Sequence, residues 1–161
     1  IALATTFLLA TFYFLLKKKY LWFSFFLLLS VLTKENVYLI SAIFGIYLIK
    51  LGMKKAGLFL FLISFLGFFF LVDVIIPKVR GDSHFALEYF SNLGGSSIEI
   101  VKTSIANPLK VFALLFTSSN LEYLIRLFLP VGFVSILAPF YLLFSVPDLA
   151  INLLSKNENL R

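Results

Sequence analysis

The sequence predicts an all-α fold, a polytopic bundle of transmembrane helices. Hydrophobic residues make up 61% of the 161 residues, whereas soluble domains contain roughly 45–50%. Charged residues make up 14%, whereas soluble domains contain about 25%. A soluble domain of this size has too high a surface-to-volume ratio to bury so much apolar surface. Soluble enzymes, nucleic-acid-binding domains and disordered chains are therefore excluded. The absence of Cys excludes disulfides and thiolate chemistry.

The excess positive charge lies in two short stretches. The formal net charge is +6, and residues 17–19 and 50–55 hold six lysines and no acidic residue. Short lysine-rich loops between apolar spans are typical of the cytoplasmic side of a membrane. We therefore expect the Lys17–Lys19 and Lys50–Lys55 loops to be cytoplasmic, and we do not expect nucleic acid as a partner.

The first elements are apolar segments that these lysines separate. Residues 1–16 form an apolar helix, which we interpret as the end of a span in a longer membrane protein. Residues 20–32 and 37–49 are predicted to form a helical hairpin with Lys34 and Glu35 at its outer tip. Each arm is about 21 Å long at 1.5 Å per residue, and the hydrocarbon core is ~30 Å thick. The tip would then lie in a recess below the outer surface. The alternative is one long span with Lys34 and Glu35 in mid-membrane.

A clearly apolar span is followed by a more polar region. Residues 58–76 are predicted to run outward as one span that ends at Pro77. Residues 77–120 are predicted to be an extracytoplasmic region of short helices, parts of which lie along the membrane interface. Ser96 and Glu99 fit a capping box, which predicts a helix over 97–106. Asn107 and Pro108 predict the start of another helix toward residue 117.

The last apolar segment is interrupted by proline. Pro130, Pro139 and Pro147 break residues 121–155, which we interpret as a second membrane hairpin with its turn near Pro139. The chain is then a single membrane domain, 1–161, with transmembrane helices over 1–76, the extracytoplasmic segment over 77–120 and the hairpin over 121–155. In total we expect about five to six membrane-inserted segments.

Several motifs resemble known families. The sequence Leu32-Thr33-Lys34-Glu35 between two apolar arms resembles the Lys-Glu hairpin of polytopic glycosyltransferases that use lipid-linked sugar donors, the GT-C superfamily. Other stretches resemble the uncharacterised prokaryotic membrane family called domain of unknown function 2079, itself thought to be a distant relative of GT-C enzymes. These stretches are His84-Phe85-Ala86-Leu87-Glu88-Tyr89, Leu93-Gly94, Ser97-Ile98-Glu99-Ile100, Asn107-Pro108, Leu129-Pro130-Val131-Gly132-Phe133, Leu137-Ala138-Pro139 and the run from Val146 to Ser155.

The resemblance implies a bundle of many helices whose active face lies outside the cytoplasm. GT-C enzymes also carry an acidic motif in their first outer loop, which supplies the base or a metal ligand. This chain starts too late to contain such a loop, so the resemblance implies that the base lies upstream of residue 1.

The Lys34-Glu35 pair is the first candidate site. A charge in mid-membrane costs ~2.5–3.5 kcal/mol on insertion scales, so something must offset it. Lys34 could bind the phosphate of a polyprenyl-phosphate donor while Glu35 orients it. The alternative is a hairpin tip whose charges extend into the headgroups.

The second candidate site is the polar segment around His84. His84 and Glu88 are spaced i, i+4, so an α-helix would place both on one face, where they could act as catalytic general acid or base. The alternative is an exposed hydrogen-bonded pair. Two such groups do not make a zinc site, so we assign no cofactor and leave a divalent metal open.

Further charged residues have structural alternatives. Arg80 could hold a pyrophosphate or an acidic sugar, together with Lys102, Lys110 and Arg126. For Arg126 we favour an ion pair with Glu122, four residues earlier. Asp73 is interpreted as an acid near the outer interface, although a longer helix would make it an intramembrane carboxylate and a candidate base.

These observations lead to one functional hypothesis with two alternatives. We expect a transferase that moves a sugar from a polyprenyl-phosphate donor to an acceptor at the extracytoplasmic face, with membrane lipid as its surroundings. A transporter or flippase of lipid-linked substrates would use broken helices and intramembrane charges equally well. A non-catalytic membrane scaffold is the third interpretation.

Overall fold

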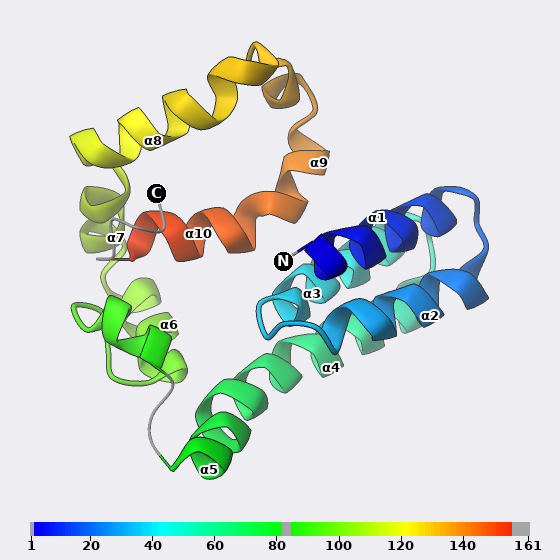
Figure 1. Cartoon of the computed structure of the whole chain (residues 1–161), viewed down its shortest axis with the longest axis horizontal. Helices are drawn as coiled ribbons and strands as arrows, with labels where there is room; N and C mark the ends of the chain where they lie inside the picture. Colours follow the sequence, from blue (N-terminus) through cyan, green and yellow to red (C-terminus); the bar gives the residue numbers. More distant parts are fainter. Residues whose placement is uncertain (1, 82–84, 156–161) are drawn as a thin grey trace. The chain divides into compact units, whose positions relative to one another are not determined.

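The computed structural model describes residues 2–81 and 85–155 (Figure 1). Every regular element in these ranges is helical, which confirms the all-α class. The chain divides into two compact units, residues 1–68 and residues 69–161. Each unit is described by itself.

The first unit consists of consecutive antiparallel helices (Figure 1). These are α1 (Ala2–Leu16), α2 (Tyr20–Val31), α3 (Val37–Lys50) and most of α4 (Lys54–Phe70). The ring centroids of Phe23 in α2 and Phe44 in α3 lie 5.7 Å apart, as expected for two arms that fold back at the Lys34 turn. This arrangement contradicts the alternative of one long span through Lys34 and Glu35. Both lysine-rich turns lie at one end of the unit, and the Lys34 turn lies at the other.

The core of this unit surrounds α3, because that helix contacts its neighbours on several sides. Phe44 is 2% exposed and contacts the rings of Phe12 and Phe23. Leu15, Val37 and other buried side chains complete the core: Leu27, Ile40, Ala42, Ile43 and Leu48. By contrast, most of α4 is open. Its outward side chains are large and apolar, among them Leu58, Phe59, Leu62, Ile63, Leu66 and Phe70.

Small residues allow α3 and α4 to approach closely. A Cβ atom on Gly45 would lie only 2.6 Å from the backbone nitrogen of Phe61, so the position admits only glycine without movement. One turn earlier, Ser41 accepts a hydrogen bond of 2.8 Å from the hydroxyl of Ser64, and both serines are buried. Helix pairs in membranes commonly pack through small residues four apart and through serine hydrogen bonds. The sequence interpretation did not identify this contact.

The turns at the lysine-rich end have a common geometry. After α3, Gly52 adopts φ of 88°, and the N–H groups of Gly52 and Met53 donate to the carbonyls of Ile49 and Leu48. After α1, Lys18 adopts φ of 56° with the same pattern of bonds to the preceding turn. Both are helix-terminating motifs that use a left-handed residue. They reverse the chain within three residues and leave the lysine side chains exposed.

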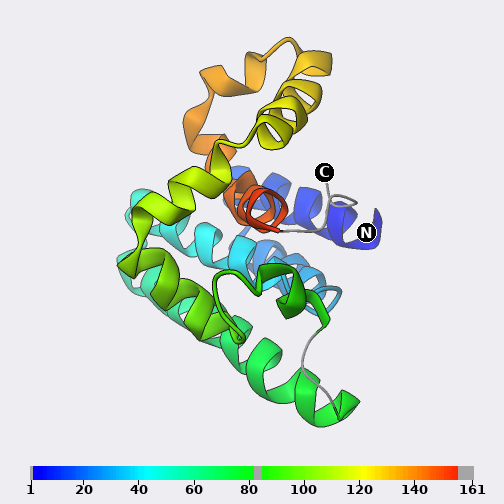
Figure 2. The ribbon, with the colours of Figure 1, turned by 90° about the vertical axis from the view of Figure 1, so that its left-hand side faces the viewer.

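The second unit starts within the longest helix of the chain. After α4 the helix continues through a π-helical segment, η1 (Leu71–Ile75), into α5 (Ile76–Arg80) (Figure 2). The prediction that Pro77 ends the span was wrong. Pro77 lacks an N–H and its ring crowds the carbonyl four residues earlier, and the wider π turn before it accommodates both effects. The helix Lys54–Val79 has 26 residues and is about 39 Å long at 1.5 Å per residue.

The rest of the second unit is built from short helices. They are η2 (Phe85–Phe90), α6 (Ser97–Ala106), α7 (Pro108–Leu115), α8 (Ser118–Phe128), η3 (Leu129–Val131), η4 (Val134–Leu137), α9 (Pro139–Leu142), η5 (Leu143–Ser145) and α10 (Val146–Leu154). α7 and α8 are bent by 61° at their junction (Figure 1). The start of α8 is joined to the end of α10, since Asn120 donates to the Leu153 carbonyl and the Asn152 amide donates to the Tyr123 hydroxyl.

Few of the described helices are long and apolar enough to cross a membrane alone. Among the described residues, only Lys54–Val79 is long and apolar enough to cross a membrane alone. The bent pair α7–α8 would add one more as a broken span, or would form a re-entrant loop. The other apolar helices, such as α1 and α3, have 10–17 residues. The expected five to six membrane-inserted segments are therefore not confirmed.

Candidate functional site

Backbone hydrogen bonds hold the Lys34-Glu35 turn, and the lysine side chain is exposed. The carbonyls of Lys34 and Glu35 accept the N–H groups of Val37 and Tyr38, both at 3.2 Å, and so begin α3. On the other side, the Thr33 hydroxyl donates to the Ser30 carbonyl at 2.6 Å and closes the end of α2. Lys34 is exposed and Glu35 is half-buried. The arrangement presents one cation on a fixed turn between two short apolar helices.

The second predicted site lies largely outside the described residues. His84 is among the residues that the structure does not describe, and the side chains of Glu88 and Arg80 are likewise outside it. The backbone of Glu88 belongs to η2, a 3₁₀ helix, and Arg80 ends α5. The pairing of His84 with Glu88 and the anion-binding role of Arg80 therefore stay predictions.

Lys110 and Arg126 of the second unit have different local partners. Lys110 donates a hydrogen bond of 2.5 Å to the carbonyl of Asn92. Arg126 forms the predicted ion pair with Glu122, at 2.6 Å, with both side chains more than half exposed. Lys102 is exposed on α6. The ion-pair interpretation of Arg126 is confirmed.

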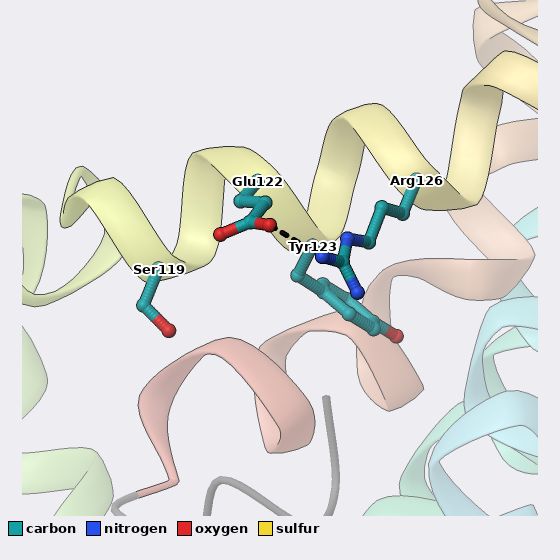
Figure 3. A pocket seen from close by; sticks show the side chains of 4 residues that line it. All are labelled: Ser119, Glu122, Tyr123 and Arg126. Atoms are coloured by element: carbon teal, nitrogen blue, oxygen red, sulfur yellow. Dashed lines mark hydrogen bonds and ion pairs between the residues drawn. The ribbon is translucent and has the colours of Figure 1, made fainter.

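A shallow pocket of about 140 Å³ lies along the polar face of α8 (Figure 3). Its lining is formed by Ser119, Glu122, Tyr123 and Arg126. The hydroxyl of Tyr123 accepts a hydrogen bond of 3.1 Å from the Asn152 amide on α10. Because Glu122 already neutralises Arg126, the pocket presents a charge-balanced polar surface. The i, i+3 and i+7 spacing of Ser119, Glu122 and Arg126 could have identified this face, but the sequence interpretation used only the ion pair.

Asp73 connects the long helix to α6. Its Oδ1 accepts the backbone N–H of Ser97 at 3.1 Å, and its Oδ2 accepts the Ser97 hydroxyl at 2.5 Å. Ser97 is only 6% exposed. A carboxylate at the first residue of a helix satisfies unpaired N–H groups and interacts favourably with the helix dipole. The helix that carries Asp73 is longer than predicted. Both carboxylate oxygens accept hydrogen bonds from Ser97, so Asp73 positions the start of α6.

The predicted helix starts are mostly confirmed. α6 covers residues 97–106 as expected, and the Ser96 hydroxyl accepts the Glu99 N–H at 3.3 Å. The Glu99 carboxylate returns to the N–H of Gly95, at 2.8 Å, and not to that of Ser96 as a standard capping box would have it. α7 starts at Pro108 as predicted, but the Asn107 side chain makes no capping bond.

Metal ligands do not converge in the part of the chain that the structure describes. No group of three or more His, Cys, Asp or Glu side chains there could hold an ion. A divalent metal at the predicted His84 and Glu88 site is neither supported nor contradicted.

Comparison with known proteins decides the family. The whole chain, residues 1–161, matches the family described as predicted membrane protein (DUF2079). The chain belongs to this family. It is therefore a member of a family of predicted membrane proteins, in agreement with its composition and its long apolar helix. Neither the curated proteins nor the solved structures contain a significant match to it. The GT-C similarity is not shown by these comparisons.

Proposed function

We propose that this protein binds a polyprenyl-phosphate sugar at the Lys34 turn and transfers the sugar to an acceptor at the extracytoplasmic face, as a GT-C-type glycosyltransferase. The single observation that carries the proposal is the position of Lys34. It lies on a fixed turn between two short apolar helices, at the opposite end of the unit from both lysine-rich turns. Those turns, residues 17–19 and 50–55, we place in the cytoplasm because lysine-rich loops favour that side.

The length of the hairpin supports a phosphate role for Lys34. α2 has 12 residues and α3 has 14, so the helices are about 18 and 21 Å long. The hydrocarbon core is ~30 Å thick. A hairpin that starts at the cytoplasmic headgroups therefore ends about 10 Å below the outer surface, if it stands upright. A cation at that depth is costly unless an anion compensates it, and a lipid phosphate at the same depth is a suitable anion.

The proposed reaction needs few groups. An acceptor hydroxyl attacks the anomeric carbon of the sugar, the bond from that carbon to the phosphate oxygen breaks, and a carboxylate takes the hydroxyl proton. Lys34 stabilises the negative charge on the leaving phosphate. Glu35 orients Lys34, Arg80 assists with the anion, and His84 with Glu88 lines the acceptor side. In this proposal the base is the acidic motif that the GT-C resemblance implies.

The experiment measures donor binding to the intact protein in lipid nanodiscs. With a fluorescent polyprenyl phosphate as the probe, Lys34→Ala should weaken binding at least tenfold, because a charge-assisted bond contributes about 1.5–3 kcal/mol. Lys34→Arg should retain most of the affinity. Lys54→Ala removes another exposed lysine, at the other end of the unit, and is the matched control. Equal affinity of Lys34→Ala and Lys54→Ala would overturn the proposal.

The alternative of a transporter or flippase rests on a different observation. α7 and α8 are bent by 61°, and the long helix contains a π segment with a carboxylate in it. Transporters commonly place substrate sites at such broken helices. Movement of a labelled polyprenyl-phosphate sugar across proteoliposomes without cleavage of the sugar–phosphate bond would favour this alternative. Cleavage with transfer of the sugar would favour the glycosyltransferase.

A further inference from the structure

α6 exposes a stripe of aliphatic residues, which is bordered by the exposed charged residues Glu99 and Lys102. Ser97 and Ser104 lie on the inner face, where Ser97 is 6% exposed and the Ser104 hydroxyl bonds to the Ile100 carbonyl at 2.7 Å. The outer face presents Ile98, Val101 and Ile105, and Ile105 is 77% exposed. An exposed apolar stripe beside charged residues is typical of helices that lie at the boundary between acyl chains and headgroups.

α7 repeats the pattern at the same spacing. Leu109 and Phe112 of α7 and Phe116, the residue that follows this helix, are exposed, and each lies eleven positions after a member of the α6 set. Leu109 is 83% exposed, and the rings of Phe112 and Phe116 stack with centroids 6.2 Å apart. Positions i, i+3 and i+7 fall on one side of a helix. We call these six residues of α6 and α7 the outer stripe.

The Asp73–Ser97 contact sets the depth at which the outer stripe starts. The apolar stretch from Ala56 to Ile76 is about 30 Å long, which equals the thickness of the hydrocarbon core. Asp73 is three residues from the end of this stretch, about 4.5 Å inside its edge. Because Asp73 binds the first residue of α6 through both oxygens, α6 begins at the boundary between acyl chains and headgroups.

We propose that α6 and α7 lie in the plane of the membrane interface, with the outer stripe inserted among the lipid acyl chains and Asp73 as the anchor. Interfacial helices insert their apolar faces ~5–10 Å into this boundary, and the anchor Asp73 lies about 4.5 Å inside it. Lys102, exposed on α6, can extend from this level to lipid phosphates. The occupant of the stripe is bilayer lipid, and this proposal does not depend on the sugar-transfer reaction.

The chain contains no cysteine, so single cysteines can report the environment of each position. Nitroxide labels at Ile105→Cys and Phe112→Cys are introduced into the intact protein in vesicles of phosphatidylethanolamine and phosphatidylglycerol. Collision rates with oxygen, which partitions into acyl chains, and with a water-soluble nickel chelate are then compared. Ala106→Cys is the matched control, since the next residue of a helix points about 100° away.

Both stripe labels are expected to collide more often with oxygen than with the chelate, and Ala106→Cys is expected to be more accessible to the chelate. Equal or greater access of the chelate at Ile105 and Phe112 would place the stripe in water and overturn the proposal. Protection of both positions from both reagents would place them against protein, in a partner or another part of the chain, and would overturn it as well.

Discussion

The backbones of Gly45 in α3 and Gly57 in α4 are in direct contact. A Cβ atom on Gly45 would lie 2.7 Å from the Gly57 carbonyl oxygen, and one on Gly57 would lie 2.5 Å from the Gly45 carbonyl oxygen. Apolar side chains gain little from meeting each other in lipid, so close backbone contact is a main source of helix association in membranes. This glycine pair fixes the distance between α3 and α4.

Gly45→Ala should destabilise the first unit. Alanine has the better helix propensity by about 1 kcal/mol, but overpacking costs typically 1–3 kcal/mol, and here the obstructing atoms are backbone. We expect a net loss of about 1 kcal/mol or more, measured by unfolding in increasing SDS with the fluorescence of Trp22, the one tryptophan. Gly95→Ala is the control, because its Cβ would meet only a flexible carboxylate, at 3.6 Å. Equal stability of the two variants would contradict the close contact.

The hydrogen bond between Ser41 and Ser64 should appear as a coupling energy. Each single change to alanine removes the bond of 2.8 Å between two buried hydroxyls. Bonds of this kind between membrane helices contribute about 0.6 kcal/mol on average and up to about 1.7 kcal/mol. In a double-mutant cycle of unfolding free energies, Ser41→Ala and Ser64→Ala together should therefore cost less than the sum of the single changes. Strict additivity would show that the bond contributes nothing.

The Asp73–Ser97 contact predicts an order of effects on α6. Asp73→Ala removes the acceptor of both bonds, whereas Ser97→Ala removes only the hydroxyl bond and retains the backbone N–H. Loss of a helix-capping side chain costs about 0.5–2 kcal/mol. Hydrogen exchange of the first α6 amides should accelerate strongly in Asp73→Ala and less in Ser97→Ala. The reverse order would show that Asp73 is not the anchor of α6.

Asn120 joins three helices at the bend between α7 and α8. It is fully buried, and its Nδ2 donates to the carbonyls of Leu114 at 2.7 Å and Leu153 at 3.0 Å. Asn120→Asp would place a second acceptor against those two carbonyls, so it should destabilise more than Asn120→Ala, which costs about 1–3 kcal/mol. Thermal unfolding of the intact protein in detergent gives both values.

Asn107→Ala is the control for these two variants, since its exposed side chain makes no capping bond. Changes at such surface positions are usually within about 0.5 kcal/mol. If Asn120→Asp is as stable as Asn107→Ala, the three-helix junction does not depend on the amide.

Local signals in the sequence predicted a large part of this structure. The helices on both sides of Lys34 and the start of α6 at Ser97 follow from apolar runs, lysine clusters and a capping pattern, each of which acts within a few residues. The end of the long helix was mispredicted because a π turn before Pro77 compensates for the proline. The Gly45–Gly57 contact and the Asp73–Ser97 bonds were missed, since both join residues that are far apart in the sequence and depend on the packing of whole helices.

The candidate site was predictable only as single residues. Lys34 lies on a turn as expected, and Arg126 pairs with Glu122, because both features depend on neighbours along the chain. Whether Lys34 meets Arg80 and Glu88 depends on how distant segments assemble in the membrane, which no local pattern encodes.

The proposed function requires Lys34 to lie on the side of the membrane opposite to both lysine-rich turns. Single cysteines at Lys19, Lys34 and Lys54, all exposed in turns or at helix ends, can be labelled in intact cells with a maleimide that does not cross the membrane. Lys34→Cys should be labelled from outside, and Lys19→Cys and Lys54→Cys only after the cells are permeabilised. Labelling of Lys19→Cys and Lys54→Cys from opposite sides, or of Lys34→Cys from the same side as both, would contradict the hairpin and the site built on it.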